Sequence, residues 1–331
     1  MEKKKKILVI RFSSMGDIIY TTPVVRCLKQ QIPNAEIHFL TKTQFKYIYN
    51  NNPYLDKLHI LKPKLKDTIR DIKAENFDCI VDLHTNLRTT IIKLATGIKA
   101  YTYKKERIKK WLALKFKSAK FIDPRHLVDR YLAAVKPLGV INDNKPIDYY
   151  INGNYKIEDL VPGSHAASYT AFIIGATHFT KRLPVEKIIK ICNNIQNPIV
   201  LLGGNDVQEN ALKIEKAIGQ KIYNTCGKIN LDQSVYVVSK ASNVIGFDTG
   251  LTHISEAFDK PLASIWGGTT PELLGVHPYK IKNSFIVDVD LPCRPCSKFG
   301  LEKCPLEHFN CMNKIDEAKV SDYINTISSY E

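Results

Sequence analysis

The chain has 331 residues, more than one hydrophobic core usually serves, so we expect two domains. A hydrophobic fraction of 44% and a charged fraction of 24% are ordinary for a globular protein and exclude a mainly disordered chain. The formal net charge of +15 favours an anionic partner: nucleic acid, an anionic membrane or a phosphorylated substrate. The first apolar run, which stops at Arg11, is too short for a signal peptide, and no run reaches the ~20 residues of a spanning helix. We therefore expect a cytoplasmic protein.

Strand and helix patterns alternate through the first half of the chain. Short apolar, β-branched runs predict strands over 7–10, 36–40 and 79–83. A helical pattern follows each of these runs. It covers 18–31 after the first, reaches about residue 50 after the second, and covers 86–96 after the third. Alternation of this kind implies a parallel sheet with helices on both faces.

A polar segment, 142–164, separates this half from a second set of strand patterns. These predicted strands cover 170–174, 198–202, 243–247 and 262–266. We expect an α/β protein with two Rossmann-like domains, each a doubly wound parallel sheet, facing each other across a cleft. The expected parts are an N-terminal domain, a C-terminal domain and a C-terminal helix that can pack back on the N-terminal domain: 1–155, 165–315 and 316–331.

Ligands of such sheets bind beyond the carboxyl ends of the strands, so the loops there are the candidate sites. The first strand leads into Ser13-Ser-Met-Gly-Asp17. Asp17 has two interpretations: a helix N-cap, or a general base that takes a proton from an acceptor hydroxyl. The loop lacks the G-x-G-x-x-G spacing, so a dinucleotide site is not supported there.

Three loops of the second half carry further candidates. Thr177 and Lys181, after the strand at 170–174, can bind phosphate oxygens, or belong to an ordinary polar loop. Gln208 and Glu209, after a Gly-Gly turn, can bond a ribose hydroxyl. Gly246-Phe-Asp-Thr-Gly-Leu-Thr-His253 ends a strand and opens a helix, whose first amides form an anion site. The carboxylate of Asp248 would repel a diphosphate, so we expect it to orient the loop.

The eight cysteines fall into two groups. Four are scattered through predicted strands and helices and are interpreted as small buried residues: Cys27, Cys79, Cys192 and Cys226. The other four gather near the C-terminus and begin with a C-x2-C pair: Cys293, Cys296, Cys304 and Cys311. A structural zinc or iron ion is the first interpretation, with His308 as a substitute ligand, and free thiols or disulfides are the alternatives.

Two distant motifs carry a resemblance to a known family. Ile7-Leu-Val-Ile-Arg-Phe-Ser-Ser-Met-Gly-Asp-Ile18 precedes Thr22-Pro23, and Asp248-Thr-Gly-Leu-Thr-His253 precedes Gly267-Gly-Thr-Thr-Pro271. In order and spacing they resemble the heptosyltransferases of glycosyltransferase family 9, over nearly the whole chain. The resemblance implies a GT-B fold and an inverting transfer of heptose from ADP-heptose to a lipopolysaccharide core (Kdo or heptose) acceptor, with no metal cofactor for catalysis.

The resemblance also implies roles for single residues. Asp17 matches the proposed base, and Lys181, with Thr177 beside it, matches a lysine that contacts the donor phosphates. The diphosphate loop matches at Asp248, Thr249, Gly250, Leu251 and His253. Gln208 stands where the family has a ribose-binding glutamate, with Glu209 next to it, so the ribose contact and the nucleotide stay open. A similar cysteine cluster occurs in part of the family.

The acceptor side rests on two basic segments, 62–66 and 104–117. They correspond by region to where the family meets anionic glycolipids at the cytoplasmic face of the inner membrane. The second segment is either an interfacial membrane helix or a core-facing stripe with snorkelling lysines. Rival functions are transfer from another nucleotide sugar or to a protein acceptor, a nucleotide-sugar epimerase, and a basic nucleic-acid-binding protein. The aromatic spacing argues against nucleic acid as a partner.

Overall fold

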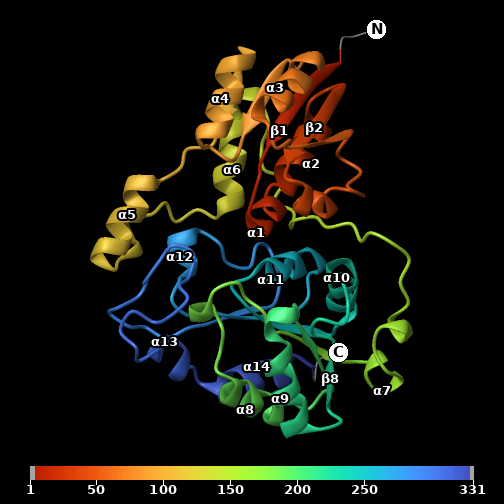
Figure 1. Ribbon diagram of the computed structural model, residues 1–331, viewed down its shortest axis with the longest axis vertical. Helices are drawn as coiled ribbons and strands as arrows, with labels where there is room; N and C mark the ends of the chain where they lie inside the picture. The colour runs from red at the N-terminus through yellow and green to blue at the C-terminus, as the bar shows by residue number, and fades with distance from the viewer. Residues whose placement is uncertain (1–3, 329–331) are drawn as a thin grey trace. The chain divides into compact units, whose positions relative to one another are not determined.

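The computed structural model describes residues 4–328, which form two compact units (Figure 1). Unit 1 comprises Met1–Glu106 and Arg125–Asn152, and unit 2 comprises Arg107–Pro124 and Gly153–Glu331. The chain passes for the last time from unit 1 to unit 2 at residue 152, inside the expected linker. The expected boundaries do not separate segment 107–124. This segment lies within the expected N-terminal domain, 1–155, but packs with unit 2.

Unit 1 contains a five-stranded parallel sheet with the order β3-β2-β1-β4-β5. Its strands are β1 (Lys5–Ile10), β2 (Ala35–Thr41), β3 (Lys57–Ile60), β4 (Cys79–Asp82) and β5 (Ala100–Thr102). The run from Ile7 to Ile10 is fully buried, as expected for a parallel strand that is covered on both faces. The sequence analysis missed β3 and β5, the two edge strands, because neither has a continuous apolar run.

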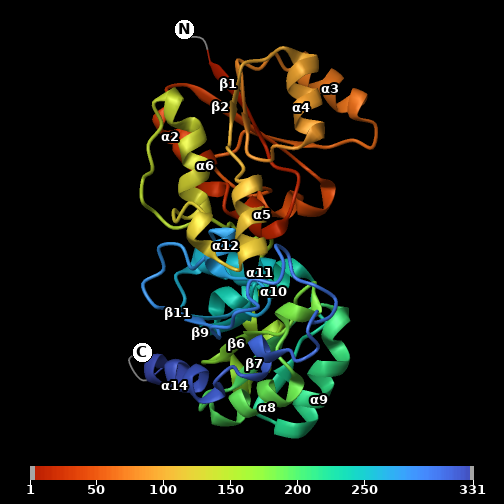
Figure 2. The ribbon, with the colours of Figure 1, turned by 90° about the vertical axis from the view of Figure 1, so that its left-hand side faces the viewer.

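Helices cover both faces of this sheet. They are α1 (Met15–Ile19), α2 (Thr22–Gln31), η1 (Thr43–Ile48), α3 (Leu65–Ala74), α4 (Leu87–Thr96), α6 (Leu127–Val135) and η3 (Lys136–Leu138). Figure 2 shows α3 and α4 on one face and α2 and α6 on the other. The helix expected over 18–31 is instead two helices, because Thr21 caps a new start and Pro23 occupies its first turn. The helical pattern reaching residue 50 is a 3₁₀ helix.

Unit 2 contains a six-stranded parallel sheet with the order β11-β10-β9-β6-β7-β8. Its strands are β6 (Thr170–Ile173), β7 (Ile199–Leu202), β8 (Ile222–Asn224), β9 (Asn243–Phe247), β10 (Leu262–Ile265) and β11 (Ser284–Val287). The expectation of two α/β units, each with a doubly wound parallel sheet, is confirmed. The short strands β8 and β11 were not predicted.

The longer helices of unit 2 are α5 (Arg107–Phe116), α8 (Val185–Asn194), α9 (Gln208–Ile218), α10 (Leu231–Lys240) and α14 (Glu317–Ser328). The shorter ones are η2 (Ala119–Phe121), η4 (Ile157–Asp159), α7 (Gly163–Ala166), η5 (Phe179–Lys181), η6 (Asn205–Val207), α11 (Gly250–Ser255), η7 (Glu256–Phe258), α12 (Pro271–Leu274) and α13 (Asn310–Asn313).

The C-terminal helix α14 belongs to unit 2 and packs on α8. Lys187 Nζ lies 2.9 Å from Glu317 Oε1, and the backbone amide of Gln196 donates to Asn325 Oδ1 at 3.0 Å. Val320 and Ile324 are buried in the core of this unit. These contacts make the helix part of the C-terminal unit; its packing back on the N-terminal domain stays a prediction. Residues 329–331 of the expected helix lie outside the described range.

The α5 segment is held to unit 2 by few contacts. Ala113 is buried against Leu273, and Lys117 Nζ donates to the carbonyl of Pro295 at 3.0 Å. Trp111 and Phe116 are 57% and 59% exposed, so they are not the core-facing stripe that the sequence offered as an alternative. None of the helices within residues 4–328 has the length and apolarity needed to cross a bilayer.

Candidate functional site

The sheet of unit 1 reverses its winding direction between β1 and β4, the place where doubly wound sheets bind ligands. Arg11, directly after β1, is buried and bridges the two strand ends. Its Nη1 donates to the carbonyl of Leu83 at 2.6 Å, and its Nε donates to the carbonyl of Ser13 at 2.7 Å. The guanidinium therefore fixes the shape of the loop that leads to Asp17.

Asp17 lies in the first turn of α1, where its Oδ2 atom receives three contacts. Arg11 Nη2 lies 2.6 Å away, Ser14 Oγ donates at 2.7 Å and the Ser14 amide donates at 3.2 Å. Ser14 is the N-cap, so Asp17 supports the cap from three residues further on and is not the N-cap itself. The side chain is 32% exposed, so it can still be reached from solvent.

The surroundings of Asp17 favour its charged form. Burial acts to raise the pKa of the carboxyl, but the Arg11 charge and the hydrogen bonds from Ser14 outweigh it, so the pKa is lowered. Asp17 is therefore ionised at neutral pH and can accept a hydrogen bond from a hydroxyl group. A carboxylate of this kind orients a nucleophile and takes its proton as the bond forms.

The sheet of unit 2 changes direction between β6 and β9. Lys181, in η5 after β6, and Asp248, directly after β9, meet at this point, with Nζ 2.5 Å from Oδ2. Thr269 Oγ1 donates to the same carboxylate oxygen at 2.9 Å, from the loop after β10. Asp248 is buried, so it holds the surrounding donors in place, the orienting role that its sequence context predicts.

His253 lies between two carboxylates on α11 and its continuation. Its Nε2 is 3.2 Å from Asp248 Oδ1, and its Nδ1 is 3.2 Å from Glu256 Oε1. Burial alone would lower the pKa of the imidazole, but the two carboxylates raise it to about 9. The same contacts hold the pKa of Asp248 well below its usual range. His253 is therefore an imidazolium at neutral pH and adds a positive charge beside Lys181.

The first turn of α11 brings backbone donors to the same edge. Thr249 is the N-cap, and Gly250 and Leu251 open the helix. The preceding strand needs Gly246, because a Cβ there would lie 2.2 Å from Thr252 Oγ1. Free amides at a helix start, next to two cations, form a site for an anion.

Three predicted residues lie at the same edge of the sheet without joining this network. Thr177 is exposed in the loop between β6 and η5, and Gln208 and Glu209 are exposed in the first turn of α9. Within residues 4–328, no hydrogen bond or ion pair links any of them to Lys181 or Asp248.

Sequence reasoning missed three members of these networks: Arg11, Glu256 and Thr269. Arg11 and Thr269 stood inside motifs that the sequence analysis quoted, and Arg11 directly follows a strand. That position was a usable signal, because polar residues at strand ends line the ligand edge of a parallel sheet. Glu256 carried no such signal, since its role depends on the pairing with His253.

The two cysteine groups differ in the structure. The four scattered thiols are buried as expected. In the second group, burial and, to a smaller extent, the neighbouring thiols raise the pKa of Cys296. The same causes raise the pKa of Cys311 to about 11. Soft thiol donors fit zinc or iron. Across the described residues, however, no three of these four sulfur atoms come within 4.8 Å of one another. The alternative ligand His308 is exposed, and its Nδ1 accepts from the Asn310 amide.

Unit 1 also has a basic pocket of about 290 Å³ at the carboxyl edge of its sheet. Its cations are Lys42, Lys62 and Arg88, which follow β2, β3 and β4 respectively. The remaining lining residues are Thr43, Gln44, Leu61, Pro63 and Leu65. The predicted basic segment 62–66 therefore contributes to a concave surface that suits an anionic group.

Comparison with protein families gives one match that covers most of the chain. The model described as glycosyltransferase family 9 (heptosyltransferase) matches residues 66–307. Lipopolysaccharide heptosyltransferase 1 of Campylobacter coli is 24% identical over 288 residues, covering 80% of this chain and 84% of that protein. The enzyme of the same name from Escherichia coli K12 is 24% identical over 292 residues, covering 82% and 90%.

Solved structures share the fold. A family 9 glycosyltransferase of Veillonella parvula superposes with a TM-score of 0.79 at 19% identity, covering 100% of this chain and 99% of that one. Escherichia coli heptosyltransferase WaaC with ADP gives 0.69 at 19% identity, covering 97% and 99%. The iron-containing dodecameric glycosyltransferase TibC of enterotoxigenic Escherichia coli gives 0.60 at 14% identity, covering 100% and 77%.

Proposed function

Because the chain belongs to glycosyltransferase family 9 and is therefore a glycosyltransferase, we propose that it transfers heptose from ADP-heptose to an anionic lipopolysaccharide-core acceptor. The observation that carries the proposal is the group of Lys181, Asp248 and His253 at the switch point of unit 2. Two positive charges and the first amides of α11 meet there. This arrangement suits the diphosphate of a nucleotide sugar.

The donor half of the reaction rests on unit 2. Lys181, the His253 imidazolium and the amides at 249–251 take up the negative charge that grows on ADP as it leaves. The protein's own cations thus supply the charge that a divalent ion supplies elsewhere, and no metal takes part in the proposed step. Gln208 or Glu209 bonds the ribose, and Thr177 lies beside the phosphates. The relative with ADP supports this nucleotide.

The acceptor half rests on unit 1. Asp17 accepts the proton of an acceptor hydroxyl, whose oxygen forms the new bond to the anomeric carbon while the bond to ADP breaks. One direct displacement inverts the anomeric configuration. The cations of the basic pocket, Lys42, Lys62 and Arg88, bind the acid groups of the acceptor sugar. The proposed reaction requires Asp17 and the phosphate site to reach the same sugar.

We place this reaction at the cytoplasmic face of the inner membrane. The support is α5, where Ile108, Trp111 and Phe116 are exposed on a helix that also carries one arginine and three lysines. A helix of this composition lies in the interface of an anionic bilayer. A peripheral position there would bring the enzyme to a glycolipid acceptor.

We also propose that the four C-terminal thiols hold one structural zinc or iron ion, supported by their gathering within nineteen residues of the sequence and by the name of the iron-containing relative. Protein purified without added metal is expected to carry close to one equivalent, and replacement of Cys293 and Cys296 by serine removes it. Less than about a tenth of an equivalent in the wild-type protein would contradict a resident ion.

One assay separates the proposal from its rivals: incubation with ADP-heptose, with and without a Kdo-bearing lipid acceptor. We expect release of ADP and a heptosylated lipid only when the acceptor is present. Consumption of the donor without any acceptor would favour an epimerase. Turnover with a different nucleotide sugar or with a protein acceptor would support glycosyl transfer but contradict the proposed substrates. A protein inert in all these mixtures that binds DNA in a steeply salt-dependent way would overturn the proposal.

A further inference from the structure

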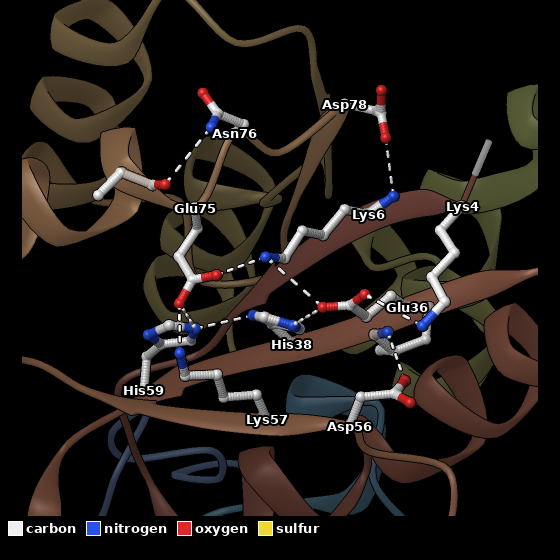
Figure 3. Close-up of polar contacts among 12 residues, drawn as sticks. Lys4, Lys6, Glu36, His38, Asp56, Lys57, His59, Glu75, Asn76 and Asp78 are labelled. Atoms are coloured by element: carbon white, nitrogen blue, oxygen red, sulfur yellow. Dashed lines mark hydrogen bonds and ion pairs between the residues drawn. The ribbon is translucent and has the colours of Figure 1, made fainter.

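A second polar cluster lies in unit 1. His38 and His59 stand on the neighbouring strands β2 and β3, and Glu75 directly follows α3 (Figure 3). Their side chains meet on the sheet face that α3 covers, where His38 is the middle residue of β2 and His59 is the third of the four residues of β3. The proposed transfer reaction uses residues of the loops beyond the strands and gives none of these three a role.

The three side chains direct ligand atoms toward a common point. His38 Nδ1 lies 2.8 Å from His59 Nε2, and His59 Nε2 lies 3.9 Å from Glu75 Oε1. All three atoms lie within 4.8 Å of one another, and this is the sole group of three or more such ligand atoms found in residues 4–328. Two imidazole nitrogens and one carboxylate oxygen are a frequent ligand set of zinc and other divalent transition metals.

Glu36 orients the first of these ligands. His38 is buried, and its Nε2 lies 2.8 Å from Glu36 Oε1. A proton on Nε2 satisfies the carboxylate and leaves the lone pair of Nδ1 facing His59. Histidine ligands of metals usually donate their other ring nitrogen to a carboxylate in this way, which fixes the tautomer.

The two imidazole rings are stacked on each other, with centroids 5.0 Å apart and planes 28° apart. Phe77 packs against both rings, with centroids 5.1 and 6.0 Å away, which holds them in place. His59 is 12% exposed, so an ion can enter from solvent.

We propose that His38 Nδ1, His59 Nε2 and Glu75 Oε1 bind one divalent transition-metal ion, with zinc as the best-fitting ion. Metal–nitrogen bonds of about 2.0–2.1 Å in a tetrahedral site place two nitrogens roughly 3.3 Å apart, so the rings must separate slightly. The ion takes the place of the proton between the rings, and the proton of His59 moves to Nδ1. Water completes the coordination.

Two lysines compete with the ion for Glu75. Lys57 binds Oε1, the oxygen that faces the metal point, whereas Lys6 binds Oε2. Lys57 is 54% exposed and can turn into solvent, and Lys6 can stay in place. Because Lys57 occupies the oxygen that would bind the metal, we expect its removal to strengthen metal binding. Removal of a ligand is expected to weaken it.

The test is a zinc titration of metal-free, full-length protein, in which the bound equivalents are counted. Zinc also binds thiols, so the quantity of interest is the difference between wild type and variants that all retain the eight cysteines. His59→Gln is expected to lose one bound equivalent. Glu36→Gln is expected to lower the affinity of this site for zinc by roughly 10–100-fold. Lys57→Met is expected to raise that affinity by roughly two- to fivefold. Magnesium, which prefers an all-oxygen shell, is expected not to compete.

The matched control is Asp71→Asn, compared with Glu75→Gln on the same segment. Asp71 Oδ2 pairs with Lys62 Nζ at 2.5 Å and offers no ligand to the cluster, so its loss leaves the titration unchanged. Cobalt used in place of zinc reports the ligand type, because thiolate ligands add a strong near-ultraviolet absorption that imidazole does not. Equal zinc equivalents in wild type and His59→Gln, with both folded by circular dichroism, would overturn the site. The glycosyl-transfer assay is read separately, so failure of one proposal leaves the other intact.

Discussion

At the scale of single residues, two carboxylates of this protein have opposite surroundings. Asp17 is partly exposed, whereas Asp248 is buried and contacted by Lys181 of η5, His253 of α11 and Thr269 of the loop after β10. The first can meet a substrate hydroxyl, and the second can only position Lys181 and His253. Their spacing in the sequence does not reveal this division, which follows from burial and partners.

The first prediction concerns Asp17→Asn. A general base contributes roughly 10²–10⁴-fold to a rate, so we expect turnover to fall by at least about 100-fold. Affinity for ADP, which we propose that unit 2 binds, is expected to stay within about twofold of wild type. Steady-state kinetics and ADP titration measure the two effects.

Ser14→Ala is the matched control for Asp17→Asn. It removes the Ser14 hydroxyl contact with Oδ2 but retains the carboxylate and its pairing with Arg11. We expect a loss of only a few fold. If both variants lose activity equally, the role of Asp17 is to shape the loop and not to accept a proton.

The second prediction concerns Lys181→Met. The proposed charged contact of this lysine with the donor phosphates would be worth roughly 1.5–3 kcal/mol, so ADP should bind about 10–100-fold more weakly. Lys187→Met is the control, because this lysine also forms a part-buried ion pair, with Glu317, away from the site. It should lower stability and leave ADP affinity unchanged. Equal weakening by both variants would contradict a phosphate contact.

At the scale of elements, the start of α11 and the exposed face of α5 differ in chemistry. The α11 turn combines backbone amides with cations, which suits a small anion. In contrast, α5 exposes large apolar side chains beside its basic ones, and Lys115 Nζ lies 5.0 Å from the ring centre of Trp111. Such a combination suits a surface that is both apolar and anionic.

The third prediction therefore concerns α5 and membranes. Trp111→Ser should weaken binding to vesicles that contain anionic lipid by roughly tenfold, because a large apolar side chain no longer enters the interface. Ile141→Ser is the control, since Ile141 is also strongly exposed but lies in another segment. Co-sedimentation with vesicles measures both. Unchanged binding of the Trp111 variant would exclude α5 as the membrane contact.

At the scale of the whole molecule, each unit has its own core and its own ligand edge. Both tryptophans, Trp111 and Trp266, belong to unit 2. Tryptophan fluorescence therefore follows the unfolding of unit 2 alone. This separation makes a pH experiment on the donor unit straightforward to interpret.

The fourth prediction concerns the stability of unit 2 and His253. Its pKa of about 9 in the folded protein exceeds the ordinary value near 6.5 in the unfolded chain. The added stability is fully present below about pH 6.5 and is lost as the pH rises through 9, by up to about 3 kcal/mol. Denaturant unfolding followed by fluorescence should show this decline in wild type and a flatter profile in His253→Gln. Parallel profiles would contradict a protonated His253.

Much of the fold follows from local pattern. Apolar β-branched runs predicted the central strands, because side-chain periodicity and turn residues are properties of neighbouring positions. The edge strands β3, β5, β8 and β11 escaped prediction because their partial burial leaves a weak pattern. The same reasoning placed Asp17, Lys181 and Asp248 at strand ends, where parallel sheets bind ligands.

The sequence by itself thus determined two α/β units and put the candidate residues in the loops beyond their strands. Only the tertiary structure decided which of these residues meet. The pairing of Lys181 with Asp248, the packing of 107–124 and α14 on unit 2, and the convergence of His38, His59 and Glu75 all join separate elements. Strand order, register and helix packing set such contacts, and these depend on the free energy of the whole fold and not on any local stretch of chain.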